Sequence, residues 1–238
     1  METRSNPEQA RLAVQERLRE QPGEAAAHLE LGLLELQHFH NYQEALDCFE
    51  QAARLDPQWP LPWMFAGVAL VRLKQEQRSL EYLTRAAALG YEGVLLSEAL
   101  GDAYLGVGDT DAALRMYARA FRLSRGRASI ESKLGLAEVC SGKIRSGLAR
   151  MGRALEQHPE SPEFHDRLID AWLLLGRLDK AAQAAERKLE AVEPRAEHYL
   201  GAAGIRLRMR DWRRAVAVLK LGLARFPESV SLRAALEE

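Results

Sequence analysis

The feature that most constrains this sequence is a period of 34 residues that runs along almost the whole chain. A series of small residues shows it most clearly, and each member precedes an amphipathic stretch. Its members are Ala10, Ala45, Ser79, Ala113, Gly147, Ala181 and Ala215, separated by 35 residues once and then by 34 residues five times. Four further series keep the same register. A sustained period of this length indicates a stack of similar structural units.

Each period predicts two helices, because apolar and small residues recur at steps of three and four. In the unit that spans 94–127, Leu100 and Tyr104 belong to a first apolar stripe, and Ala113 and Tyr117 belong to a second. The segment Gly-Asp-Thr-Asp at 108–111 separates the stripes. We expect it to end one helix and to cap the next.

Small residues at fixed positions predict close contact between the two helices of a pair. Gly101 and Ala113 leave room for the helix backbones to approach, and Tyr104 and Tyr117 are expected to fill the space around them. The glycine belongs to a series on the first stripe: Gly32, Gly67, Gly101, Gly135, Ile169 and Ala203. A bulkier series on the second stripe is Val14, Phe49, Leu83, Tyr117, Met151, Ala185 and Leu219.

These residues resemble the tetratricopeptide repeat, a helix pair with a period of about 34 residues. The resemblance covers roughly residues 7–227. Its clearest matches are Leu31, Gly32, Ala45, Phe49, Ala52 and Pro57 in the first unit, Trp63, Gly67, Ser79, Leu83 and Ala86 in the second, and Leu100, Gly101, Tyr104, Ala113, Tyr117 and Ala120 in the third. It implies an all-α fold, a right-handed α-solenoid of antiparallel helix pairs.

The organisation expected from the repeat is one solenoid domain over residues 1–238. A lone second helix at 7–21 is predicted to cover the N-terminal end, and a helix at 228–238 is predicted to cap the other end. The six full repeats between them are expected at 25–58, 59–93, 94–127, 128–161, 162–195 and 196–227.

Two repeats depart from the family pattern, and we expect them to pack less tightly or to bend the array locally. The fourth has Glu138 in place of the usual aromatic residue and Gly147 in place of alanine. The fifth has Ile169 in place of glycine and Lys188 in place of alanine. The first repeat carries one extra residue, which we place in the turn at 38–42.

The resemblance implies that the first helix of each pair lines a concave surface on which partners bind. The residues expected on this groove are Leu29, Leu33, Leu36, Met64, Val68, Val71, Arg72, Glu98, Asp102, Leu136, Asp166 and Asp170. Its N-terminal half is unusually apolar, and an exposed apolar patch usually marks an interface. We expect an apolar helix or extended segment there, with carboxylates that favour a basic flank.

Adaptor or assembly scaffold is therefore the predicted function, and two alternatives stay open. The apolar patch could instead hold a second copy of the chain in a homo-oligomeric structural protein. The array could also be a regulatory module that serves an enzyme such as a glycosyltransferase. A clamp for a terminal carboxylate is disfavoured, because the matching positions offer Leu29, Leu33, Met64 and Glu98 in place of cationic donors.

The charge balance gives no global attraction to nucleic acid or to a membrane, since the formal net charge is -1. Arginines crowd the last repeat, but a solvated outer face explains them better than a nucleic-acid site. The sequence contains no secretory signal and no run of eighteen apolar residues, so we expect a cytoplasmic protein.

Catalytic motifs are absent from the sequence, so we expect no enzyme, no cofactor and no metal. His38 and His40 lie close together but lack a further ligand at tight spacing, which favours a polar turn. Cys48 and Cys140 are far apart, and we expect both to be buried or partly buried thiols.

Overall fold

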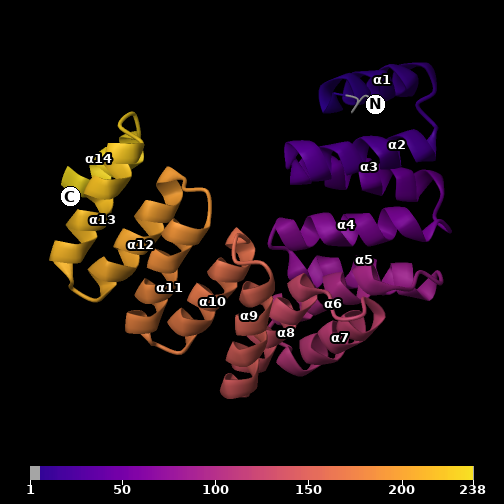
Figure 1. The fold of residues 1–238 in the computed structure, drawn as a ribbon. Coiled ribbons are helices and arrows are strands. Elements are labelled where there is room, and N and C mark those ends of the chain that lie inside the picture. The colour runs from indigo at the N-terminus through magenta and orange to yellow at the C-terminus, as the bar shows by residue number, and fades with distance from the viewer. Residues whose placement is uncertain (1–5, 238) are drawn as a thin grey trace. The chain divides into compact units, whose positions relative to one another are not determined.

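The computed structural model describes residues 6–237, and every regular element within that range is a helix (Figure 1). The predicted all-α repeat fold is confirmed. The chain divides into two compact units, one ending at Ser124 and one beginning at Arg125. That residues 1–238 form one solenoid domain stays a prediction.

Unit 1 contains an N-terminal helix followed by three helix pairs. The helices are α1 (Pro7–Glu20), α2 (Ala25–Leu34) with its π-helical continuation η1 (Glu35–Phe39), α3 (Tyr42–Leu55), α4 (Pro60–Arg72), α5 (Glu76–Ala88), α6 (Val94–Gly106) and α7 (Thr110–Leu123). Unit 2 contains three pairs and a shorter last helix. They are α8 (Ala128–Cys140), α9 (Ile144–Gln157), α10 (Pro162–Leu174), α11 (Leu178–Ala191), α12 (Ala196–Arg208), α13 (Trp212–Arg225) and α14 (Val230–Glu237).

In the first three pairs, a glycine of the first helix packs against a bulky side chain of the second. A Cβ added to Gly101 would lie 2.6 Å from the ring of Tyr117, whose side chain is buried. The Ser79 hydroxyl donates a hydrogen bond of 2.8 Å to the carbonyl oxygen of Gly67, which also joins two paired helices. The predicted close approach is thus confirmed. Asp109 caps α7 as expected, since its carboxylate accepts a hydrogen bond from the backbone of Ala112 at 2.9 Å.

The extra residue of the first repeat is accommodated inside a helix rather than in the turn after it. The last turn of the first helix widens into the π-helix η1, which holds one more residue per turn than an α-helix. His40 then ends the helix with a left-handed backbone at φ 56°. The Asn41 side chain donates to the carboxylate of Glu35 at 2.7 Å, and the Arg11 guanidinium of α1 lies 4.2 Å from the centre of the Phe39 ring. The widened turn therefore fastens α1 to the first pair.

The fourth repeat is packed closely, so the expectation of looser packing there is wrong. Both facing positions are glycines, and a Cβ added to Gly135 would lie 2.7 Å from the carbonyl oxygen of Gly147. Glu138, which replaces the aromatic residue, is buried and accepts a hydrogen bond of 2.8 Å from Arg150 on α9. Backbone contact and an ion pair take the place of the ring that Tyr104 supplies at this position in the third repeat.

The two cysteines differ in exposure. Cys48 is half-buried, and burial, followed by the charges of Glu35, Asp47 and Glu44, raises its pKa to about 11. Cys140 is exposed, which corrects the expectation that both thiols are at least partly buried. Partial desolvation raises the pKa of Cys140 as well.

Replacing Gly147 by alanine should destabilise unit 2, because the new Cβ would overlap the carbonyl oxygen of Gly135, which cannot swing away like a side-chain tip. We expect a loss of about 2 kcal/mol or more in the free energy of unfolding. Gly152→Ala, on the same helix, is the matched control, since a Cβ there meets nothing within 4 Å. The Gly152→Ala substitution should raise the free energy of unfolding by about 0.5–1 kcal/mol. Equal effects in urea denaturation would contradict the packing described for α8 and α9.

Thiol labelling should separate the two cysteines. At pH 8, Ellman's reagent is expected to modify Cys140 at least about tenfold faster than Cys48, because only the thiolate reacts and a raised pKa reduces its population. The rate at Cys48, measured in a Cys140→Ser variant, should rise with pH until it levels near its pKa of about 11. Rapid labelling of Cys48 at pH 8 would show that its environment is more open than described.

Candidate functional site

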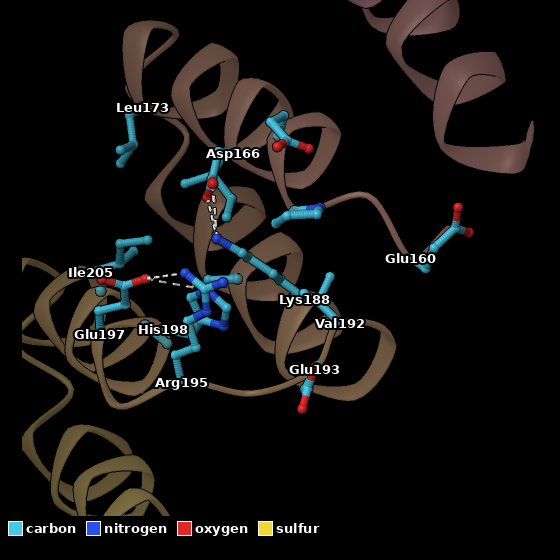
Figure 2. Close-up of a pocket in the computed structure, with 16 residues that line it drawn as sticks. Glu160, Asp166, Leu173, Lys188, Val192, Glu193, Arg195, Glu197, His198 and Ile205 are labelled. Atoms are coloured by element: carbon cyan, nitrogen blue, oxygen red, sulfur yellow. Dashed lines mark hydrogen bonds and ion pairs between the residues drawn. The ribbon is translucent and has the colours of Figure 1, made fainter. Parts of the chain in front are cut away.

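A pocket of about 860 Å³ lies in unit 2 between the first helices of the fifth and sixth repeats. Helix α10 provides one wall through Ile169 and Leu173, and α12 provides the other through Gly201 and Ile205. The second helix of the fifth repeat, α11, and the link to α12 form the floor (Figure 2). The site thus lies on the side of the repeat where the resemblance places partner binding.

The pocket occurs where the fifth repeat departs from the packing rule of the others. In this repeat the bulky and the small partner are exchanged, so that Ile169 stands on the first helix and Ala185 on the second. Both residues line the pocket, and Ile169 packs against the core cluster that contains Ala185. An alanine on α11 occupies less space than the Phe49 or Tyr117 side chain found at this position in other repeats.

Lys188 is the second departure, and it places a cation at a position that is alanine in four other repeats. Ala52, Ala86, Ala120 and Ala154 have no exposed surface at this position. The Lys188 side chain is only 9 % exposed, and its Nζ donates to both oxygens of Asp166 at 2.6 and 2.8 Å (Figure 2). An ion pair therefore occupies the space between α10 and α11.

The segment between α11 and α12 enlarges the floor of the pocket. Helix α11 ends at Ala191, and Val192 and Arg195 have extended backbones at φ -110° and -129°. At the end of the first repeat, by contrast, the Trp59 backbone donates to the Asp56 carbonyl oxygen at 3.2 Å and closes a tight turn. Glu193 stands where the first repeat has Pro57.

His198 lines the pocket with a side chain that is 8 % exposed. Burial, and then the charge of Lys188, lowers its pKa, which favours the neutral ring. Its Nε2 lies 3.9 Å from a carboxylate oxygen of Glu197. Its Nδ1 is buried and has no hydrogen-bond partner among residues 6–237. A buried polar nitrogen without a partner is costly, and a ligand can supply the missing hydrogen bond.

Negative charge dominates the polar groups of the pocket. Five carboxylates line it, against the two permanent cations Lys188 and Arg195. One cation pairs with Asp166, and Arg195 lies 3.6 Å from Glu197. The pKa of Glu163 is lowered by a hydrogen bond from its own backbone and by the Ser161 hydroxyl, so this carboxyl group stays ionised.

The apolar residues predicted for unit 1 are less accessible than the sequence suggests. Met64 has no exposed surface and Leu29 is 7 % exposed, so both belong to the core. This corrects the expectation that they lie on a binding surface. The remaining four are half-buried and border two core clusters, and they are Leu33, Leu36, Val68 and Val71.

The polar residues predicted for unit 1 lie nearer the surface. Arg72 is exposed, and Glu98 and Asp102 are half-buried. Asp102 is already engaged within the third pair, because it accepts a hydrogen bond of 2.6 Å from the Tyr117 hydroxyl. This hydrogen bond holds its carboxylate within the third pair.

Of the residues predicted in unit 2, only Asp166 lines the pocket. Asp170 is exposed one turn further along α10, and Leu136 of α8 is half-buried against a different cluster. Glu163, Glu197 and His198 were not predicted as site residues from the sequence. The signal that could have found them was the pair of departures at Ile169 and Lys188, which marks this repeat.

Within residues 6–237, no group of three or more His, Cys, Asp or Glu side chains is placed to hold a metal ion. Over the same range, none of the helices has the length and apolar character needed to cross a membrane.

Sequence profiles described as tetratricopeptide repeat match residues 3–58, 39–91 and 132–196, and a second profile with the same description matches residues 96–131. The chain belongs to the tetratricopeptide repeat family. A search of curated protein sequences gave no match.

Solved structures of other tetratricopeptide repeat proteins share the fold. A chain of the APC/C hetero-tetramer Cut9–Hcn1 is similar with a TM-score of 0.71 and 18% identity, over 98% of this chain and 46% of that one. A tetratricopeptide repeat protein from Parabacteroides merdae has a TM-score of 0.72 and 14% identity, covering 97% and 91%. YrrB, described as having an unusual peptide-binding site, has a TM-score of 0.55 and 18% identity, covering 76% and 93%. The present chain thus spans less than half the length of the Cut9–Hcn1 chain.

The ion pair between Lys188 and Asp166 should be needed for the stability of unit 2. Asp166→Asn leaves the ammonium group in a site that is 9 % exposed without its anion, and we expect a loss of about 1–2 kcal/mol in the free energy of unfolding. The double variant Asp166→Asn/Lys188→Met should regain most of that loss, since no charge is then left unpaired. Asp179→Asn, which removes the exposed pair with Arg177, is the control and should have little effect. Stability of Asp166→Asn equal to wild type in urea denaturation would refute this role.

Proposed function

We propose that this tetratricopeptide repeat protein is an adaptor or assembly scaffold that holds a segment of a partner protein on the faces of its first helices. The observation that carries the proposal is the pocket between α10 and α12, which combines an apolar wall with a few charged groups. This combination is usual for binding sites, where apolar contacts supply affinity and polar groups supply orientation. The tetratricopeptide repeat is itself a protein-interaction fold.

Unit 1 supports an apolar segment as the main part of the partner. Leu33, Leu36, Val68 and Val71 remain half-buried at the edges of their core clusters, so a partner could complete their burial. An amphipathic helix or an extended strand presents apolar side chains at a spacing suited to contact these four residues. Glu98 on the next first helix favours a positively charged flank.

Two of the similar solved structures are consistent with a protein-binding role. One is part of a hetero-tetrameric assembly and another is described as having a peptide-binding site. At 18% identity these likenesses concern the fold, so they support a class of function and not a particular partner. The regulatory module for an enzyme and the cytoplasmic location stay predictions from the sequence.

Self-association is the second candidate, and exposed apolar residues in unit 2 favour it. Trp212, Leu221 and Val230 are 61%, 64% and 75% exposed. A second copy of the chain could cover such exposed apolar side chains. Light scattering during size-exclusion chromatography separates the two candidates, because a scaffold for another protein is expected to elute at the mass of one chain, 26.7 kDa.

Selection from a displayed library of random dodecapeptides tests the proposed function. Wild type should enrich peptides that carry an apolar core, and the double variant Leu33→Glu/Val68→Glu should bind them at least about tenfold more weakly, because two charges would be buried beneath the partner. Isothermal titration would measure the dissociation constants.

The matched control is Leu12→Glu/Val107→Glu, which places the same charges on exposed residues of unit 1. This control should bind like wild type, and circular dichroism should show equal helix content in all three proteins. If no peptide is enriched, or if the Leu33 and Val68 variant binds as tightly as wild type, the proposed function is refuted.

A further inference from the structure

We propose that the pocket between α10 and α12 is a specificity pocket for a single lysine or arginine side chain of the partner protein. The inference rests on the proposed function, because the side chain is presented by a bound segment. It goes further by naming the chemical group that one repeat recognises and the residues that recognise it.

The shape of the site suits a long side chain with a charged end. Ile169 and Leu173 on α10 and Ile205 on α12 give apolar walls, and Gly201 leaves α12 without a side chain at that point. Lysine and arginine bury their aliphatic stems along apolar surfaces of this kind while the charged head remains near polar groups. A short polar side chain would leave the walls uncovered.

The charges of the site select a cation. Lys188 is already neutralised by Asp166, at 2.6 and 2.8 Å, and Arg195 lies beside Glu197. Among the described lining residues, no salt bridge joins a cation to the other three carboxylates, Glu160, Glu163 and Glu193, although the charges of Arg167 and Lys188 act on Glu163. An anionic ligand would meet this excess of negative charge, whereas an ammonium or guanidinium group would reduce it.

The geometry of His198 adds an acceptor. We assign the proton to Nε2, which lies 3.9 Å from a Glu197 carboxylate oxygen and forms no hydrogen bond with it at that distance, so that Nδ1 carries the lone pair. Nδ1 is the buried nitrogen that has no partner within the described chain. A lysine or arginine head group consists only of donors, so it can satisfy this nitrogen, whereas a carboxylate cannot.

The pocket is particular to this repeat. Two features are confined to the fifth of the helix pairs: the exchange of bulk between Ile169 and Ala185, and a lysine at a position that is alanine in four other pairs and glycine in the sixth. A partner segment that lies along the first helices would therefore meet one cation-selective position in unit 2. That gives the partner a fixed register, because its basic residue must be placed at this site.

Isoleucine methyl groups provide a direct readout of this pocket. The chain has four isoleucines, of which Ile169 and Ile205 line the pocket while Ile130 and Ile144 do not. The probes are four acetylated tripeptide amides with leucine at both ends and lysine, arginine, norleucine or glutamate in the middle. Methyl spectra of isoleucine-labelled protein should show the lysine and arginine probes shifting Ile169 and Ile205 and leaving Ile130 and Ile144 unchanged.

Charge variants test the cause of the selectivity. Glu163→Gln/Glu193→Gln removes two of the three carboxylates to which the selectivity is assigned and should weaken binding of the lysine and arginine probes by about tenfold. Glu156→Gln/Glu228→Gln makes the same change in charge on exposed residues of unit 2 outside the pocket, and it should bind like wild type.

The outcomes separate this inference from the proposed function. Equal shifts with norleucine, or stronger shifts with glutamate, would overturn the cation pocket and leave a peptide-binding scaffold. The same holds if no tripeptide shifts Ile169 and Ile205 while library peptides still bind in a way that depends on Leu33 and Val68. Failure of every peptide to bind anywhere would refute both.

Discussion

Contact between a small residue and a large one, across each pair of antiparallel helices, is the interaction on which the rest of this structure depends. Gly32, Gly67 and Gly101 receive the side chains of Phe49, Leu83 and Tyr117, so closely that a Cβ would overlap them. Interiors packed at this density tolerate little change in volume. The contact recurs with the period of the sequence, and it therefore fixes the distance between helices in one pair after another.

Departures from this contact have opposite results in the fourth and fifth pairs. In the fourth, two glycines face each other and the helices approach more closely, with Glu138 paired to Arg150 where a ring would otherwise stand. In the fifth, the bulk moves to Ile169 and a lysine enters the neighbouring position, and a pocket results. The volume and charge of the side chains at two or three positions thus decide whether a repeat is tightly packed or borders a pocket.

The fold could be predicted from the sequence because it depends on periodic volumes, which are visible in residue types alone. The residues of the candidate site were harder to predict, because the exposed fraction of a side chain depends on how neighbouring helix pairs cover it. Met64 and Val68 were both predicted to face a groove, yet a core cluster with residues of α5 and α6 buries Met64 completely and leaves Val68 partly exposed at its edge. Asp166 was predicted as an anion for a partner, but its pairing with Lys188 requires a contact between residues 22 positions apart, which no local pattern reveals.

The central claim is that the two departures in the fifth repeat open the pocket, and a crystal structure of the Lys188→Ala variant tests it most directly. Ala52, Ala86 and Ala154, at this position in other repeats, are fully buried and belong to core clusters that include residues of the first helix of the next pair. The account predicts that α12 moves toward α11 and that the pocket of about 860 Å³ becomes much smaller. A pocket of unchanged volume, with α12 at its original distance, would show that Lys188 does not hold it open and would contradict the account.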